Sequence, residues 1–399
     1  MAICIAMHSY RVSRQLKQPK RSFFLFGPRG TGKSTWLKHV LPSALYIDLL
    51  DASLFLELSR DPHRLEAIIG TQPEQSWVVL DEIQKIPALM DEVHRLMEMK
   101  RWRFALCGSS ARKLKRGGAN LLAGRALTLS MESFSAFELN QAFDLDYALS
   151  WGMLPLVHEE PDLAADILAA YINTYLKEEI QAEGLIRNVP PFLRFLAIAG
   201  QINGQSLNIQ TIARDAAVAR STVDTYFSIL IDTLVGHLLP AWRPGLKVRE
   251  AAQPKFYWFD PGVARGAAGL LRDSPDRIWQ GTALETLVFQ EIRIYNQVSA
   301  QHRPVAYYRT PAGVEIDFII ETAARQPGKV PEIIAIEVKR SEQWQREWCK
   351  PMLNLAGTKN VNVKHMIGVY CGGRTYQFGD IQVYPFKDFV HRLTAGEFY

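Results

Sequence analysis

The chain has few cysteines, no long apolar run and only a small excess of one charge. Its four cysteines lie far apart among 399 residues and form no CxxC pair, which argues against a disulfide framework or a zinc site. No stretch approaches the roughly 18 apolar residues of a membrane span. The apolar start at residues 1–7 has no basic residue ahead of it, unlike a secretory signal. We therefore expect a cytoplasmic protein with no membrane contact.

The composition is typical of a globular protein with more than one domain. The chain is 48% hydrophobic and 22% charged, without low-complexity tracts or internal repeats. Its length favours two or three domains. The net charge of +5 permits nucleic-acid binding but does not by itself indicate it.

The order of apolar patterns divides the chain into three parts. From residue 23 to about 130, short β-type runs alternate with amphipathic helical stretches, which predicts a mostly parallel α/β sheet. Residues 133–235 have helical patterns and are interpreted as a helical lid. From about residue 278 to the end, a helix and further β-type runs predict a second α/β domain.

The end of the helical part has the pattern of a helix-turn-helix. Residues 209–235 predict a short helix, a turn and a longer helix, and two β-type runs follow at 237–242 and 255–259. If those runs pair, the unit is a winged helix, which can lay its second helix in a DNA groove. Few cations lie on that helix, so DNA contact and a structural or subunit-contact role both stay open.

A complete phosphate-binding loop, GxxxxGK[ST], lies between an apolar strand and a helix. It consists of Gly27, Pro28, Arg29, Gly30, Thr31, Gly32, Lys33 and Ser34, and Thr35 follows it. The glycines let backbone N–H groups approach phosphate oxygens at a helix N-terminus. We expect Lys33 to contact the β- and γ-phosphates of ATP and Ser34 to offer its hydroxyl to Mg²⁺.

An apolar run at residues 77–80 ends in two acids, Asp81 and Glu82. Alone, such a pair is more often a solvated loop start. Next to the phosphate-binding loop, Asp81 is expected to orient the magnesium shell and Glu82 to polarise the attacking water. The pair favours hydrolysis over phosphoryl transfer to a substrate.

With these two motifs the chain resembles the AAA+ ATPases. The resemblance implies a polar sensor on a further strand, a place matched by Ser109 and Ser110, of which Ser109 is our choice although the sequence does not separate them. It also implies an arginine supplied by a neighbouring subunit, a place matched by Arg125. The alternative for Arg125 is a surface arginine at a turn. If Arg125 acts in trans, the protein assembles into a ring or at least a dimer.

A second constellation lies near the C-terminus. Asp317 is in one β-type run and Glu337 and Lys339 are in the next, on the same strand face because side chains alternate. If the strands pair, two carboxylates form a Mg²⁺ site beside a lysine that can orient water for attack on a phosphodiester. Glu285, in the preceding predicted helix, could add a carboxylate.

These four residues resemble the helix glutamate, metal aspartate and ExK pair of the PD-(D/E)xK nucleases. The sequence departs from that pattern because Glu-Ile rather than proline precedes Asp317. The alternative is a set of solvated charges, or a nuclease fold kept only for binding or assembly.

Together the three parts resemble a widespread group of prokaryotic ATP-binding proteins. The resemblance implies a P-loop AAA+ core at 1–132, a helical lid with a winged-helix-like unit at 133–260 and a PD-(D/E)xK nuclease-like α/β domain at 261–399. It favours an ATP-hydrolysing protein that acts on DNA and cuts it with Mg²⁺. The alternative is a nucleotide-switched DNA- or protein-binding regulator or scaffold whose nuclease-like domain is inactive.

Overall fold

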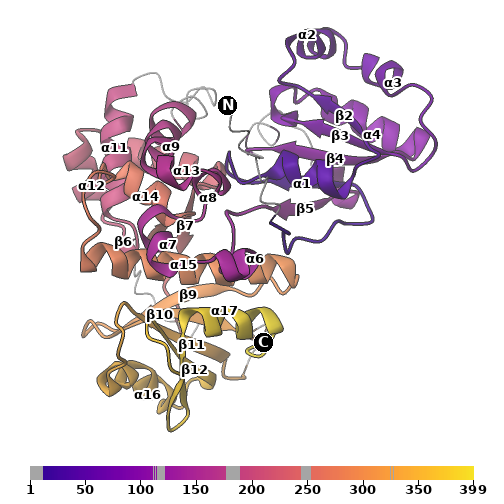
Figure 1. Ribbon diagram of the computed structural model, residues 1–399. Helices are drawn as coiled ribbons and strands as arrows, with labels where there is room; N and C mark the ends of the chain where they lie inside the picture. Colours follow the sequence, from indigo (N-terminus) through magenta and orange to yellow (C-terminus); the bar gives the residue numbers. More distant parts are fainter. Residues whose placement is uncertain are drawn as a thin grey trace, which may run out of the picture.

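The computed structural model describes residues 12–110, 112, 114, 122–176, 189–243, 253–323, 325–326 and 328–399, so the apolar start at 1–7 lies outside it. Figure 1 shows a sheet with helices in the N-terminal part, a helical part beside it, and a C-terminal part below them. Helix α15 (Arg277–Val298) runs between the helical part and the C-terminal sheet.

The N-terminal part is a five-stranded parallel sheet in the order β2-β3-β4-β1-β5. Its strands are β1 (Phe23–Phe26), β2 (Leu45–Asp48), β3 (Trp77–Asp81), β4 (Arg103–Gly108) and β5 (Leu127–Ser130). The three inner strands are buried almost throughout, which is why they consist of continuous apolar runs. The predicted parallel α/β sheet is confirmed.

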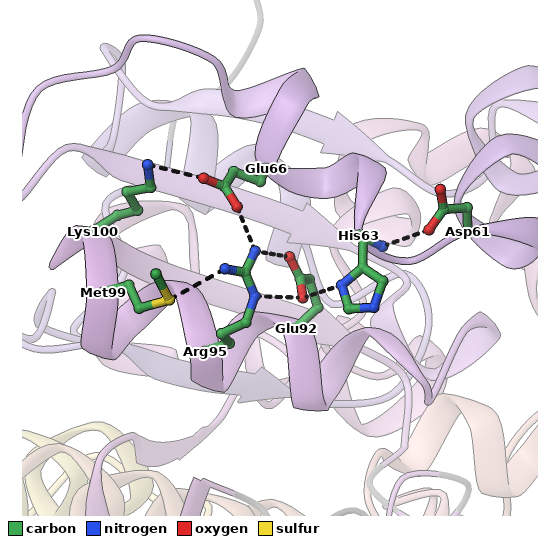
Figure 2. Close-up of polar contacts among 7 residues, drawn as sticks. All are labelled: Asp61, His63, Glu66, Glu92, Arg95, Met99 and Lys100. Atoms are coloured by element: carbon green, nitrogen blue, oxygen red, sulfur yellow. Dashed lines mark hydrogen bonds and ion pairs between the residues drawn. The ribbon is translucent and has the colours of Figure 1, made fainter.

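Short helices connect these strands. They are α1 (Lys33–Val40), α2 (Ala52–Arg60), α3 (Arg64–Ile69), η1 (Ile83–Lys85), α4 (Leu89–Lys100) and η2 (Leu122–Gly124). Figure 2 shows α3 tied to α4 through Arg95, whose Nη2 lies 2.5 Å from Glu66 Oε2 and 2.6 Å from Glu92 Oε1. Hydrogen bonds from Arg95 and Lys100 lower the pKa of Glu66 to about 2.

The middle part consists of helices and one small sheet. The helices are α6 (Ala136–Leu139), η3 (Asn140–Ala142), α7 (Leu145–Trp151), α8 (Pro155–Glu159), η4 (Pro161–Leu163), α9 (Ala164–Ala170), η5 (Tyr171–Leu176), α11 (Val189–Gln201), α12 (Ile209–Ala216), α13 (Arg220–Asp232) and α14 (Pro261–Ala267). The sheet has the order β6-β8-β7, with β6 (Gln205–Ser206), β7 (Gly236–Leu239) and β8 (Lys255–Trp258) antiparallel. The two β-type runs that follow the helix pair α12–α13 thus contribute paired strands.

The C-terminal part is a six-stranded mixed sheet in the order β13-β14-β12-β11-β10-β9. Its strands are β9 (Val305–Arg309), β10 (Glu315–Glu321), β11 (Glu332–Lys339), β12 (Asn362–Tyr370), β13 (Tyr376–Phe378) and β14 (Ile381–Pro385). One face packs against α15 and α17 (Phe386–Ala395), and the other against η6 (Arg346–Cys349) and α16 (Lys350–Ala356).

Two helices pack away from the segment in which the sequence placed them. The short helix α6, expected in the lid, lies on α17 of the C-terminal part, and α14, expected at the start of the C-terminal domain, packs between α7 and α11. A short helix buries its apolar face wherever a complementary surface is available, and sequence order does not specify that surface. No helix of the described chain is long and apolar enough to cross a membrane.

Candidate functional site

The loop at residues 27–34 turns from the C-terminal end of β1 into α1. Gly30 and Gly32 have positive φ angles of 79° and 87°, a conformation that glycine adopts without strain. Gly27 lies so close to β5 that an added Cβ would be 2.2 Å from the Met131 carbonyl oxygen. Helix α1 begins at Lys33, so its first free N–H groups lie at the loop. These features suit a loop that binds phosphate oxygens.

The side chains of the loop differ in exposure. Lys33 is buried, and its Nζ donates to the carbonyl oxygens of Gly27 at 2.8 Å and Pro28 at 2.9 Å, inside the curve of the loop. Thr31 is buried and donates to Pro28 as well, whereas Arg29 and Thr35 are exposed. The lysine charge is therefore held at the two carbonyl groups with which the loop begins.

Asp81, at the end of β3, is buried beside the loop. Its Oδ2 accepts a hydrogen bond of 2.7 Å from Ser34 Oγ and another from the Tyr46 hydroxyl of β2. Burial and the contact with Asp81 raise the pKa of Tyr46 well above its usual value. Hydroxyl and carboxylate oxygens are ligands that Mg²⁺ prefers, so Ser34 and Asp81 fit a magnesium ion. Sequence reasoning did not identify Tyr46.

Glu82, Gln84 and Ser109 form a hydrogen-bonded row next to Asp81. Glu82 has a left-handed backbone, with φ of 59°, and its N–H donates to Asp81 Oδ1 at 3.1 Å. The Gln84 side-chain nitrogen donates both to the Glu82 carboxylate and, at 3.1 Å, to Ser109 Oγ. Gly108 makes room for this amide, since an added Cβ would lie 2.2 Å from Gln84 Oε1. Sequence reasoning missed Gln84, because it stands among other polar residues, between Glu82 and Lys85, and only the structure shows that it is buried.

The four C-terminal residues lie around the adjoining ends of β10 and β11. The antiparallel register pairs Phe318 with Ile336, which puts Asp317 opposite Glu337. Lys339 Nζ lies 2.5 Å from Glu337 Oε1 and 4.0 Å from Asp317 Oδ2. Asp317 also accepts a hydrogen bond of 2.7 Å from the Val338 N–H. The pairing on which the sequence hypothesis depended is therefore present.

Glu285 approaches this group from α15 and makes its contacts with β8. Its Oε2 accepts a hydrogen bond of 3.1 Å from the Tyr257 hydroxyl and lies 4.0 Å from Lys255 Nζ. Lys255 also forms an ion pair with Glu315 of β10. Sequence reasoning missed Lys255 and Tyr257, because no spacing rule links β8 to the later strands.

The carboxylates of this group are crowded and poorly hydrated. Burial, with the nearby charge of Asp317, raises the pKa of Glu285 to about 8 and that of Glu337 to about 8. Glu337 Oε2 is buried without a hydrogen-bond partner among the described residues. Among the residues that the structure describes, no three His, Cys, Asp or Glu side chains lie close enough to hold a metal ion. The unpaired oxygen and the opposed carboxylate of Asp317 nevertheless fit a hard cation.

Three models of protein families match consecutive parts of the chain. Residues 19–140 match an AAA domain, the part that contains the phosphate-binding loop, Asp81, Glu82 and Ser109. This part of the chain is therefore similar to AAA domains, and residues 19–140 are called the AAA domain below. Residues 142–274 match a domain of unknown function, DUF8612, and residues 280–389 match another, DUF4143.

Solved structures similar to the chain include the ORC1 protein of Aeropyrum pernix in complex with DNA. The two sequences are 11% identical, the match covers 65% of this chain and 88% of that one, and the TM-score is 0.31. No curated protein matches the sequence.

The two serines after β4 of the AAA domain have different neighbours. Ser109 contacts Gln84, as described above. Ser110 Oγ donates to the Asp232 carbonyl at the end of α13, and Arg112 Nη1 lies 2.9 Å from Asp232 Oδ2. Ser109 therefore faces the acidic strand end, whereas Ser110 ties the AAA domain to the helical part.

Arg125 lies just before β5, and its Nε is 2.6 Å from Glu98 Oε1 at the surface. Leu127 of β5 pairs with Phe23 at the start of β1. Arg125 therefore lies at the N-terminal end of these parallel strands, and the phosphate-binding loop lies at their C-terminal end. Arg125 is thus placed away from the loop of its own chain.

Proposed function

We propose that the AAA domain binds and hydrolyses ATP with Mg²⁺. The observation that carries this proposal is the cluster at the C-terminal ends of β1 and β3, which consists of Lys33, Ser34, Asp81 and Glu82. The loop amides and Lys33 bind the phosphates, and Ser34 and Asp81 hold the magnesium ion, which neutralises phosphate charge. Glu82 accepts a proton from the attacking water, and Ser109 contacts the γ-phosphate.

Two substitutions separate binding from hydrolysis. Lys33→Ala should abolish ATP binding, because it removes the cation from the loop. Glu82→Gln should keep binding and reduce phosphate release about 10²- to 10⁴-fold, the usual contribution of a general base. Binding is measured with a fluorescent ATP analogue, with Lys20→Ala and Glu74→Gln, both at exposed positions, as controls. Wild-type turnover in Glu82→Gln would exclude Glu82 from this role.

We propose further that the active form is a ring or a dimer in which Arg125 acts on the ATP of a neighbouring subunit. Its exposure and its place opposite the loop support this arrangement. Lys33→Ala and Arg125→Ala should each be inactive alone but regain activity when mixed, because some interfaces then pair an intact loop with an intact arginine. No gain on mixing, together with activity proportional to enzyme concentration below self-association, would exclude action in trans.

We also propose that the protein acts on DNA and that the C-terminal group is a PD-(D/E)xK-like nuclease site. The meeting of Asp317, Glu337 and Lys339 at one spot supports it. Asp317 and Glu337 would hold Mg²⁺, which offsets charge on the scissile phosphate, and Lys339 Nζ would orient the attacking water. The helix pair α12–α13 with strands β7 and β8 has the composition of a winged-helix-like unit and is the candidate duplex contact.

A second function, a nucleotide-switched regulator or scaffold, is favoured by one specific observation. Lys339 already pairs with Glu337 at 2.5 Å, and no set of three carboxylates in the described chain is assembled for a metal. A charge cluster of this kind can be purely structural.

Cleavage assays decide between the two. The nuclease proposal predicts Mg²⁺- or Mn²⁺-dependent cutting of single-stranded, duplex, branched or supercoiled DNA that disappears in Lys339→Ala while ATPase activity stays. Lys364→Ala, at an exposed site on β12, is the matched control. No cutting of any of these substrates favours the scaffold.

A further inference from the structure

Tyr46, in β2, lies beside the nucleotide site, and the proposed function assigns it no role. Its hydroxyl donates to Asp81 Oδ2, the oxygen that also accepts the hydrogen bond from Ser34. The parallel register of β2 with β3 explains this contact, because it pairs Tyr46 with Val79, two residues before Asp81. Residues two apart share one face of a strand. The hydroxyl therefore reaches Asp81 from the neighbouring strand and not from the phosphate-binding loop.

The ring of Tyr46 is held on both sides. The side chain is half-buried and packs on the core between the sheet and α1, a core that includes Trp36 and Val79. Lys38 of α1 lies over the ring, with its Nζ 5.0 Å from the ring centroid. A cation over an aromatic face is attracted to the ring. Packing and the lysine together restrict the positions that the hydroxyl can adopt.

The Asp81 carboxylate accepts hydrogen bonds at both of its oxygens. Oδ1 accepts from the Glu82 N–H at 3.1 Å, and Oδ2 accepts from Ser34 Oγ at 2.7 Å and from Tyr46. Among these donors, the Glu82 N–H adjoins Asp81 in the backbone, and Ser34 belongs to the loop that binds the nucleotide. The position of Tyr46 therefore depends neither on the loop nor on the strand that carries Asp81.

The hydrogen bond from Ser34 to Asp81 decides what Ser34 can offer to a cation. A hydroxyl group has one proton and two lone pairs. While Asp81 Oδ2 accepts the proton, the lone pairs of Ser34 Oγ remain for a hard cation such as Mg²⁺. The direction of the carboxylate therefore affects the magnesium affinity of the nucleotide complex.

We propose that Tyr46 is a positioning residue of the nucleotide site, which holds Asp81 Oδ2 toward Ser34 so that the serine lone pairs stay available to Mg²⁺. Loss of an outer partner of this kind typically lowers metal affinity roughly 10- to 100-fold. The inference rests on the proposed binding of ATP with Mg²⁺. It gives a function to β2, which carries neither of the two sequence motifs of the site. Because Tyr46 acts through Asp81, it affects the metal ion and not the contacts of the loop with the phosphates.

Two other roles of Tyr46 predict different results. A tyrosine that only satisfies a buried carboxylate stabilises the fold, and its loss changes nucleotide affinity equally with and without Mg²⁺. A hydroxyl that competes with the cation for Asp81 raises the magnesium dependence when it is removed. A positioning hydroxyl lowers that dependence. The ratio of the nucleotide Kd in EDTA to the Kd in MgCl₂ therefore separates the three roles.

The test is titration of the full chain with a fluorescent, non-hydrolysable ATP analogue in EDTA and in excess MgCl₂, together with thermal unfolding of each variant. Tyr46→Phe keeps the ring and its contact with Lys38, so we expect it to fold. It should lower the ratio about tenfold, or to one if the wild-type ratio is smaller, and leave the Kd in EDTA unchanged. Tyr384→Phe is the matched control, because it also removes a hydroxyl that donates a hydrogen bond, at 2.7 Å to Gln382 in the C-terminal part.

Ser34→Ala removes the proposed magnesium ligand itself and separates this inference from the proposed function. If wild type and Ser34→Ala have the same ratio, the magnesium site is absent and the proposed function fails with it. If Ser34→Ala loses the magnesium dependence while Tyr46→Phe keeps the wild-type ratio or raises it, only the positioning role of Tyr46 is overturned.

Discussion

Replacement of Gln84 by leucine tests the hydrogen-bonded row of the AAA domain. The amide nitrogen of Gln84 donates to the Glu82 carboxylate and to Ser109 Oγ, and leucine has a similar volume but no donor. Gln84 Oε1 is buried without a hydrogen-bond partner in the described chain, so its removal leaves no acceptor bond unmade. The variant should fold and keep the contacts of Lys33 and Asp81 while it loses the link between Glu82 and Ser109.

The expected loss follows from the two hydrogen bonds. A bond to a charged group contributes about 1.5–3 kcal/mol and a neutral one about 0.5–1.5 kcal/mol. If Glu82 needs its bond in order to hold the attacking water, loss of the charged contact alone lowers kcat roughly 10- to 100-fold, since about 1.4 kcal/mol corresponds to a factor of ten. KM for ATP should change little, because Gln84 does not contact the phosphate-binding loop.

The assay is steady-state phosphate release over a range of ATP concentrations, with thermal unfolding measured in parallel. Gln84→Glu should be worse than Gln84→Leu, because it puts a second carboxylate against Glu82. An unchanged kcat in a folded Gln84→Leu variant, or a rise in KM alone, would refute the view that Gln84 positions Glu82.

Two further predictions concern the close packing of the phosphate-binding loop and a buried carboxyl group of α15. Gly27→Ala should lower stability by about 1–3 kcal/mol and weaken ATP binding, because the new Cβ meets the Met131 carbonyl at 2.2 Å and displaces backbone. Denaturant unfolding measures the first effect and nucleotide titration the second. Wild-type values for both would contradict the close packing. Burial raises the pKa of Glu291, which accepts a hydrogen bond from the Ala136 N–H, to about 8. The folded state therefore binds this proton more tightly than the unfolded one, and the stability that the proton contributes is complete below about pH 4.5 and is lost as the pH rises through about 8. Glu291→Gln stays neutral, so its free energy of unfolding should rise relative to that of wild type between pH 5 and 8, by at most about 1.4 kcal/mol per pH unit. A difference in stability that does not depend on pH would contradict the raised pKa.

The residues of the candidate nucleotide site could be predicted from the sequence because they form two motifs, each of which is local. The loop from Gly27 to Ser34 is one continuous segment, and Asp81 and Glu82 end an apolar run, so neighbours in sequence are neighbours in space. The buried parallel strands have continuous apolar runs, which the pattern analysis detected. Tyr46 escaped prediction because its partner Asp81 lies on another strand. Gln84 escaped because its contact with Ser109 depends on the order of the strands in the sheet.

The arrangement of Asp317, Glu337 and Lys339 could be predicted from the sequence only in part. Alternation along β11 put Glu337 and Lys339 on one face, but only the antiparallel register with β10 placed Asp317 opposite Glu337. Lys255 and Tyr257 belong to a different sheet and reach Glu285 only because β8 lies between two cores.

The sequence by itself determined which segments form strands and helices, which of their faces are apolar, and which residues form the phosphate-binding loop. Only the tertiary structure decided which surface covers each face, as the packing of α6 on α17 and of α14 on α7 and α11 shows. The physical reason is that periodicity is a local property of the chain, whereas burial is satisfied by any apolar surface of matching shape. The choice among such surfaces depends on all parts of the folded molecule at once.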